Sequence, residues 1–329
     1  MNRLATLAAV AALTAPLALS SGAHAATDRF LLFGDSLSDP GNRFAVDGLT
    51  GMVPWYPEDQ ITDGDTWATQ LGLDLASGRN FAYAGARAAT TEGGVRDLGE
   101  QIDAFLDRGP DPSAVDTTIL FLAANDLLGA VDPDSIGTSP DLDAILADLR
   151  GAAAGAIDGL LTGIETLATA RLDDFVVFGV PNLARAPRVT SLLPDDLLGG
   201  IALAVVEFNL ELQATLAALP NADQIRYFDT FGVLEAFFAD PGSIGITNTT
   251  DPCIEIAASG LSLESNCGTP QSFAFYDDLH WSETVHTAFA EVVSAELHPA
   301  PIPLPAGGAL LVAGLGAFAV LRRRQNSAS

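Results

Sequence analysis

The 329-residue sequence contains no lysine, and its 15 basic residues are all arginine. Eleven of these arginines lie between residues 26 and 300, together with all 42 acidic residues, so this part of the chain carries a formal charge of −31. Nucleic acids and anionic lipid headgroups are bound by basic patches, which such a composition does not supply. A nucleic-acid-binding protein is therefore excluded as a class.

Cysteine and histidine are scarce as well. Cys253 and Cys267 are the only cysteines, and the three histidines after residue 26 are His280, His286 and His298. A metal site needs several ligands close together, and none of these histidines falls between the cysteines, so we expect neither a metal nor another cofactor. In an exported protein such a cysteine pair most often forms a disulfide, which would close a short local loop here.

The sequence Gly-x-Ser-x-Gly is absent, which argues against the common α/β-hydrolase lipase fold. Instead, Gly34-Asp35-Ser36-Leu37 directly follows the apolar run 30–33. A strand that enters such a turn leaves the serine hydroxyl at the carboxyl edge of a sheet, where open α/β folds bind their ligands. These residue types also favour ordinary turns, so Ser36 is a candidate nucleophile only if a base lies elsewhere in the chain.

His280 is the best candidate for that base. His298 lies beside the proline-rich stretch at the end of residues 26–300. His286 falls within the helical pattern 283–297, where a packing or capping role is expected. His280 instead lies in a turn-like segment just before that helix. A base in such a turn can reach a serine at the edge of a sheet.

A carboxylate is needed to orient the imidazole, and two precede it, Asp277 and Asp278. A spacing of three residues in a turn allows Asp277 to accept a hydrogen bond from His280 and so to fix its tautomer. Asp278 is expected to project away from the ring. Ser36, Asp277 and His280 are therefore the predicted catalytic residues of a serine ester hydrolase.

Oxyanion donors are expected at the ends of other strands. Asn125 follows the apolar run Thr118–Leu122, and its neutral amide can donate hydrogen bonds without attracting the proton of the base. Gly85 follows the apolar segment Asn80–Ala84, and the lack of a side chain lets its backbone N–H approach a substrate oxygen.

Apolar runs alternate with helical patterns along the chain, which predicts one α/β domain over residues 26–300 with a mainly parallel sheet covered on both faces. The expected strands are Arg29–Phe33, Asn80–Ala84, Thr117–Leu122, Asp174–Val180 and Ile225–Phe228. The clearest expected helices are Leu142–Thr169, Asp195–Leu219 and Glu283–Leu297.

The four segments that carry Ser36, Gly85, Asn125 and Asp277–His280, in this order, resemble the GDSL esterase/lipase family, also called SGNH hydrolases. The sequence Phe-Gly-Asp-Ser-Leu-Ser-Asp-Pro-Gly-Asn resembles its phospholipase/lecithinase/haemolysin branch. The resemblance implies a flavodoxin-like, three-layer α/β/α sandwich without cofactors. It also implies that the Ser36 N–H joins Gly85 and Asn125 in the oxyanion hole.

The chain departs from the family pattern at two places. Ala123 stands where the family usually has glycine, and its methyl group is expected to narrow the pocket without closing it. Trp281-Ser282 replaces Pro-Thr after the base, and Trp281 is expected either to line a pocket or simply to pack. Neither change removes a catalytic group.

Both ends of the chain are predicted to be targeting segments. Residues 1–25 have a charged start, an apolar run and Ala23-His24-Ala25, as in secretory signal peptides. Residues 301–329 combine a proline-rich stretch, sixteen apolar residues and three arginines, which resembles a PEP-CTERM sorting tail of the Val-Pro-Leu-Pro-Ala variant. The resemblance implies processing by an exosortase-like membrane protease after transient anchoring in the inner membrane. The protein is then periplasmic, cell-surface or extracellular in a Gram-negative bacterium.

Three functions fit these features. The first is hydrolysis of small esters or lipids through an acyl-enzyme on Ser36. The second passes the same acyl group to an alcohol acceptor instead of water. The third is a surface or matrix-associated binding protein on an inactive hydrolase scaffold, and the intact candidate site argues against it.

Overall fold

A parallel sheet of four strands forms the centre of the protein. The computed structural model describes residues 29–90, 96–131, 141–257 and 262–298. The sheet has the order β1-β2-β3-β4. Its strands are Phe30–Gly34, Thr117–Phe121, Phe175–Phe178 and Ile225–Phe228. The first three are buried throughout because their continuous apolar sequences suit a sheet covered on both faces.

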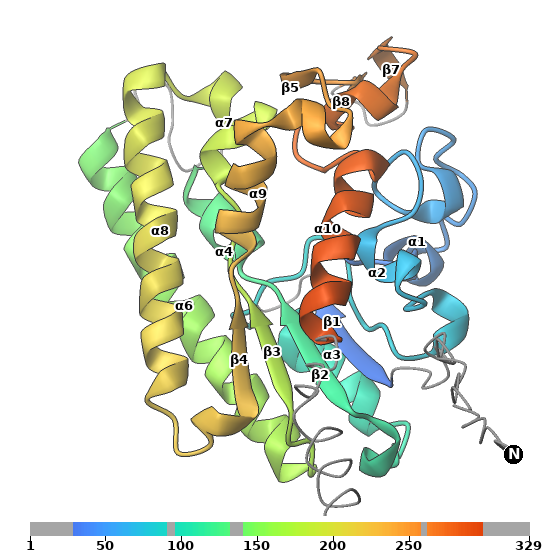
Figure 1. The fold of residues 1–329 in the computed structure, drawn as a ribbon, viewed down its shortest axis with the longest axis vertical. Coiled ribbons are helices and arrows are strands. Elements are labelled where there is room, and N and C mark those ends of the chain that lie inside the picture. Colours follow the sequence, from blue (N-terminus) through green and yellow to red (C-terminus); the bar gives the residue numbers. More distant parts are fainter. Residues whose placement is uncertain (1–28, 91–95, 132–140, 258–261, 299–329) are drawn as a thin grey trace, which may run out of the picture.

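Helices cover both faces of this sheet, so the predicted three-layer α/β/α fold is confirmed (Figure 1). α3 (Leu98–Leu106) and α6 (Leu142–Thr169) lie on one face, and α8 (Asp195–Ala217) packs along α6. On the other face α10 (Glu283–Leu297) packs against the short helices α2 (Trp67–Gln70) and α9 (Thr230–Ala239). The other α-helices of the described residues are also short: α1 Asn42–Asp47, α4 Ala124–Leu128 and α7 Pro187–Leu192.

Aromatic side chains fill the space between the sheet and α10. The Trp67 ring stacks on Phe178 with 5.4 Å between ring centroids, and Phe178 stacks on Phe228 at 4.5 Å. Phe289 of α10 lies edge-on to Trp67 at 5.8 Å. Burying rings of this size stabilises the fold by roughly 2–3 kcal/mol each, and it fixes α10 against the sheet.

The predicted strand Asn80–Ala84 is wrong as a strand, although the segment does lie beside β1. It makes one isolated parallel bridge, between Leu32 and Asn80. The ladder stops there because the Gly34 N–H donates to the Gln101 side chain. On the other side of the segment, the Asn42 amide donates to the carbonyl groups of Asn80 and Ala82.

The other predicted elements agree with the structure within a few residues. The strand β4 and the helices α6 and α10 have the predicted bounds. β3 ends at Phe178 because both backbone groups of Val180 bond to the Asn209 side chain instead of a neighbouring strand. α8 ends at Ala217, two residues early, since Leu219 precedes a proline and disfavours helix.

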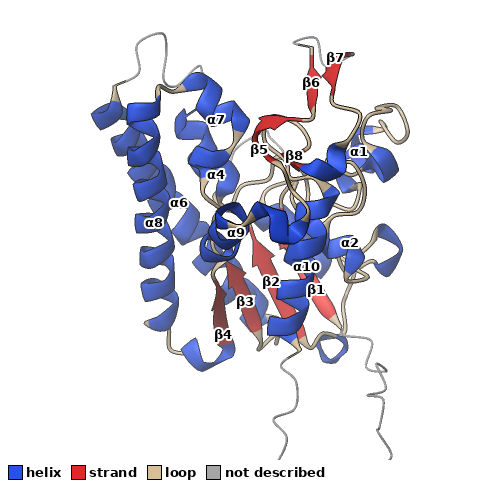
Figure 2. Cartoon of the chain, turned by 45° about the horizontal axis from the view of Figure 1, so that its top comes forward, coloured by secondary structure: helices blue, strands red, loops and turns tan. Residues whose placement is uncertain are grey.

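A small β region covers the end of the molecule where the strands of the main sheet finish (Figure 2). It contains β5 (Asn248–Pro252) paired with β8 (Phe273–Phe275), and the hairpin of β6 (Ile254–Ile256) and β7 (Leu263–Asn266). A disulfide joins Cys253 to Cys267 at the base of the hairpin. The predicted disulfide is therefore confirmed.

The predicted targeting segments, residues 1–25 and 301–329, lie outside the described residues. Within the described part of the chain, α8 alone is long and apolar enough to cross a membrane. Its Ile201, Val205 and Leu212 are fully buried, and the helix packs along α6. Leu203 and Leu210 of the same helix are exposed.

Candidate active site

Ser36, His280 and Asp277 form a continuous hydrogen-bonded row at the carboxyl edge of the sheet. The Ser36 Oγ lies 2.8 Å from the His280 Nε2. The Nδ1 of the same ring lies 2.8 and 2.9 Å from the two carboxylate oxygens of Asp277. Because a carboxylate can only accept, Nδ1 carries the proton and Nε2 is free to accept the Ser36 proton. The structure thus brings together three residues that are up to 244 positions apart in sequence.

Ser36 is placed by the end of β1. Both backbone groups of Gly34 are held by the Gln101 side chain of α3, at 3.0 and 2.8 Å. A side chain at position 34 would be crowded, since a Cβ there would lie 3.0 Å from the Ser38 Cβ and 3.1 Å from the Ala82 Cβ. The strand therefore ends in a closely packed turn, and Ser36 follows two residues later.

Asp277 is held as an anion by several donors. Its Oδ1 accepts the backbone N–H groups of Leu279 and His280 at 2.8 and 2.7 Å, and its Oδ2 accepts the Tyr56 hydroxyl at 2.6 Å. Burial acts to raise the pKa of Asp277, but the His280 imidazole and these hydrogen bonds outweigh it and lower the pKa to about 2. The Asp277 carboxylate beside His280 is thus ionised at neutral pH.

Two rejected candidates have other roles. The Asp278 carboxylate forms a bidentate ion pair with Arg188, at 2.8 and 3.0 Å, instead of bonding to the imidazole. His286 is completely buried in α10, where its Nδ1 accepts the Trp67 backbone N–H. Burial lowers the pKa of His286 to about 3, so it remains neutral. The sequence-based expectations for both residues agree with this placement.

The two predicted oxyanion donors lie in different settings. Asn125 is half-buried in the first turn of α4 and lines the same pocket as Ser36 and His280. Its Nδ2 donates to the Ala86 carbonyl at 2.9 Å, which leaves the second N–H of that amide for a substrate. Gly85 is exposed in the turn after the segment 80–84, with φ of 87°, a value that favours glycine. It is not among the residues that line the pocket.

We expect Asn125→Ala to lower kcat by roughly 10²- to 10³-fold with little change in KM, because an oxyanion donor acts mainly in the transition state. Steady-state kinetics on a chromogenic ester measures both constants. A raised KM with an unchanged kcat would instead identify Asn125 as a residue that binds the ground state.

The two departures from the family pattern have structural consequences. Ala123 is fully buried, with φ of 94°, so the methyl group at this glycine position strains the backbone by on the order of 1 kcal/mol. The lining of the pocket includes Ala124 rather than Ala123, so the expected narrowing is not seen. Trp281 fulfils both expectations, because it lines the pocket and packs on Phe289 at 5.3 Å.

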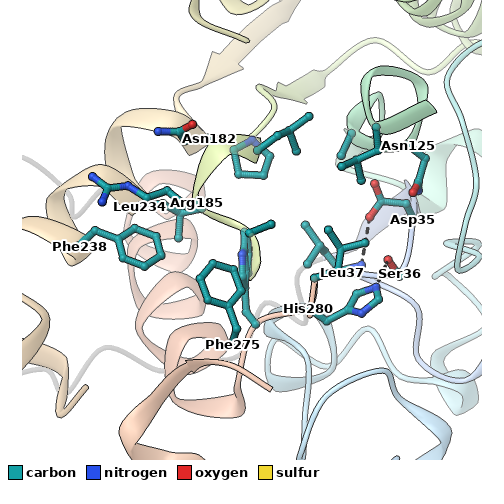
Figure 3. A pocket seen from close by; sticks show the side chains of 17 residues that line it. Asp35, Ser36, Leu37, Asn125, Asn182, Arg185, Leu234, Phe238, Phe275 and His280 are labelled. Carbon is teal, nitrogen blue, oxygen red and sulfur yellow. Dashed lines mark hydrogen bonds between the residues drawn. The ribbon is translucent and has the colours of Figure 1, made fainter. Parts of the chain in front are cut away.

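An apolar pocket of about 520 Å³, including its open mouth, runs away from the nucleophile. Figure 3 shows Ser36 and His280 at one end and Phe238, Arg185 and Asn182 at the other. At the far end Arg185 and Asn182 both bond to Glu235. Between the ends, most of the side chains that line the pocket are apolar: Leu37, Ala124, Leu128, Pro181, Leu183, Ala186, Leu234, Phe275, Leu279 and Trp281.

A second, more polar cavity borders the other side of His280, with about 1170 Å³ of space including its open mouth. It is lined by Asp277 and Tyr56, by the Arg188–Asp278 ion pair, and by the disulfide hairpin through residues such as Ile254. The imidazole therefore separates an apolar space from a polar one.

Asp35 is an unusual buried carboxyl group beside Ser36. It is 1% exposed, its Oδ1 accepts the Leu37 N–H at 3.0 Å, and its Oδ2 has no hydrogen-bond partner among the described residues. Burial raises the pKa of Asp35 to about 7, against the opposing effects of the Leu37 hydrogen bond and the nearby His280. The folded protein thus binds a proton here that the unfolded chain releases near pH 4.

This difference predicts a pH-dependent stability. The contribution of a carboxyl group whose pKa is raised on folding is fully present below its unfolded pKa of about 4, and it is lost as the pH rises to the folded pKa of about 7. Between pH 5 and 7 the free energy of unfolding should fall with pH less steeply in Asp35→Asn than in the wild type, by up to about 1.4 kcal/mol per pH unit. Urea unfolding of both proteins at several pH values measures this difference, and identical slopes would contradict the raised pKa of Asp35.

A model of the GDSL-like lipase/acylhydrolase family matches residues 30–293. The chain belongs to this family. Two curated proteins are also similar to the chain in sequence. The thermolabile hemolysin of Vibrio parahaemolyticus is 23% identical over 285 residues, 80% of this chain and 62% of the relative. The phosphatidylcholine-sterol acyltransferase of Aeromonas hydrophila is 25% identical over 246 residues, 69% of this chain and 66% of the relative. The chain thus matches less than two thirds of the length of either relative.

Solved structures of lower similarity include two from Streptomyces. The extracellular lipase of Streptomyces rimosus has 16% identity and a TM-score of 0.48, and the match covers 81% of this chain and 98% of the lipase. The phospholipase A1 of Streptomyces albidoflavus has 15% identity and a TM-score of 0.44, with the same two coverages.

Two residues of the site in this GDSL-like protein escaped the sequence analysis. Gln101 carries a signal, because it is a polar residue on the apolar stripe of α3 formed by Leu98, Ile102 and Phe105. Tyr56 carries none, since it lies in a long loop rich in glycine, proline and aspartate. Only the folded chain brings its hydroxyl to Asp277.

Proposed function

We propose that this chain is a serine hydrolase of carboxylic esters, of the esterase, lipase or phospholipase type, that works through an acyl-enzyme on Ser36. The observation that carries the proposal is the row of hydrogen bonds from the Ser36 Oγ through His280 to the buried, ionised Asp277. Membership of the GDSL-like lipase/acylhydrolase family supports the reaction class.

The proposed reaction has two steps. The Ser36 Oγ attacks the ester carbonyl carbon while its proton passes to the His280 Nε2, and Asn125 and the Ser36 N–H stabilise the oxyanion. Gly85, the third donor that the resemblance implies, does not line the pocket and has no role in this step. The imidazolium then gives its proton to the departing alcohol. Water, deprotonated by the same Nε2, cleaves the acyl-enzyme and releases the acid.

The apolar pocket favours an acyl chain as the part of the substrate that lies away from the nucleophile. Each buried CH₂ group contributes about 0.8 kcal/mol, so kcat/KM should rise by up to roughly fourfold per added carbon until the chain reaches Arg185 and Phe238. A series of p-nitrophenyl esters from acetate to octanoate tests this. A flat series would reject the pocket as an acyl site, and no turnover of any ester would reject the function.

Acyl transfer is a second candidate, because one curated relative is a phosphatidylcholine-sterol acyltransferase. The acyl-enzyme would be the same, with an alcohol in place of water in the second step. Product analysis with a sterol or sugar alcohol present separates the two, since transfer yields a new ester and hydrolysis yields only free acid.

We also propose export. The sequence of residues 1–25 supports a cleaved secretory signal, and that of residues 301–329 supports a sorting tail processed by an exosortase-like protease at the inner membrane. Intact-mass measurement of cell-associated and released protein tests both. A mature mass that includes residues 301–329 would leave permanent anchoring as the explanation.

A further inference from the structure

Tyr56 makes a hydrogen bond whose role the proposed reaction does not explain. Its hydroxyl donates to the Asp277 Oδ2 at 2.6 Å. The other oxygen, Oδ1, accepts two backbone N–H groups from its own turn, whereas Oδ2 has only Tyr56 besides the His280 ring among the described residues. Within this part of the chain, Tyr56 is therefore the one donor from outside the turn that restricts rotation of the carboxylate about the Cβ–Cγ bond.

The phenol is suited to this task because it stays protonated. Burial first, and then the charge of Asp277, raise the pKa of Tyr56 well above its usual value. A group that cannot ionise is always a donor here. It cannot add a second negative charge beside His280.

Tyr56 is held by a small apolar cluster separate from the main core. The cluster is built on Cys253, Ile254 and Tyr276, with Tyr56 and Trp55 packed against it. The rings of Tyr56 and Tyr276 meet edge to face at 6.1 Å, and the Tyr276 hydroxyl donates to the Trp55 carbonyl. The ring of Tyr56 is thus supported by the residue directly before Asp277.

The disulfide hairpin supports the same cluster. The Ile254 N–H donates to the Tyr276 carbonyl at 2.8 Å, and the Cys253 N–H donates to the Phe275 carbonyl at 3.1 Å. The Cys267 N–H donates to the Cys253 carbonyl at 2.7 Å, in addition to the disulfide. The covalent link thus closes a unit that contacts both Tyr56 and the chain leading into Asp277.

We infer that Tyr56 is a positioning residue of the Ser36–His280–Asp277 row, and that the Cys253–Cys267 hairpin is the support that keeps it there. The inference rests on the proposed ester hydrolysis. Tyr56 acts through Asp277 on the imidazole, and the disulfide acts through Tyr56.

Tyr56→Phe keeps the ring and removes only the hydroxyl. Hydrogen bonds to charged groups support an effect of about 10-fold or more on kcat, with KM changed less than about twofold. The acid limb of the pH profile of kcat/KM should move to higher pH, because a carboxylate that has lost a donor attracts the imidazolium proton more strongly. The matched control is Tyr83→Phe, which removes a hydroxyl bonded to Asp47 at 2.8 Å outside the row, and it should change neither.

The role of the hairpin is tested with a double-mutant cycle. Replacing both Cys253 and Cys267 by alanine should lower kcat when Tyr56 is present. In the Tyr56→Phe background the same replacement should change kcat by less than about twofold, because both changes disturb the contact between Tyr56 and Asp277. Circular dichroism and melting temperature identify any variant that fails to fold. The result for Tyr56→Phe can be interpreted even if the double alanine variant does not fold.

The outcomes separate the two proposals. An inactive wild type rejects the hydrolase itself. An active wild type whose Tyr56→Phe variant keeps its kcat and pH profile rejects the positioning role alone, even where its melting temperature falls. Full additivity in the cycle rejects the part assigned to the hairpin.

Discussion

Ser36→Ala should lower ester hydrolysis by at least about 10⁴-fold, to the level that transition-state binding alone sustains. The hydroxyl is the proposed nucleophile, and it lies 2.8 Å from the His280 Nε2, the base that would take its proton. The fold should be unaffected, because the Gln101 side chain holds both backbone groups of Gly34 independently of the Ser36 hydroxyl. Initial rates on a p-nitrophenyl ester, with circular dichroism on the same sample, measure both.

Ser38 supplies the matched control for this variant. It is a buried serine two residues away, and its Oγ accepts the Trp67 indole N–H at 3.1 Å. Ser38→Ala should cost about 1 kcal/mol of stability and leave the chemical step in place. Equal loss of activity in Ser36→Ala and Ser38→Ala would mean that both changes disturb the turn, and it would not support Ser36 as the nucleophile.

Asp277→Asn should lower kcat by about 10³- to 10⁴-fold, a smaller loss than that of the nucleophile. An amide that presents its NH₂ to His280 favours the tautomer with the proton on Nε2, and Ser36 then has no acceptor. Loss of the charge also removes the partner that stabilises the imidazolium. A pH–rate profile on purified protein should show the loss across the whole range.

Asp278→Asn tests whether the neighbouring carboxylate has any such role. Asp278 is paired with Arg188 and exposed, so its replacement should change kcat less than about threefold. A large effect from Asp278→Asn together with a small one from Asp277→Asn would exchange the roles of the two residues.

The sequence predicted the parts of this protein that depend on local pattern. Continuous apolar strands and amphipathic helices specified the layers, and α6 and α10 have the predicted bounds. Parallel strands end at the same edge, and for that reason residues after β1 and β2 could be expected in one site. The site follows that rule: Ser36 and Asn125 line one pocket.

The errors come from side chains that compete with the backbone ladder. Nothing local in Asn80–Ala84 indicates that Gln101 takes the Gly34 N–H and ends the pairing. The same holds for Asn209, which ends β3 by bonding to Val180. Tyr56 was missed for a related reason: its hydrogen bond is to Asp277, which lies 221 residues later in the sequence.

Covalent labelling with a fluorophosphonate tests the central claim most directly, because the probe needs a serine activated by its own base. We expect one label per molecule, located by peptide mass mapping at Ser36, with labelling abolished in Ser36→Ala and strongly slowed in His280→Ala. Labelling at any other serine, or an unlabelled Ser36 in folded protein, would contradict the account.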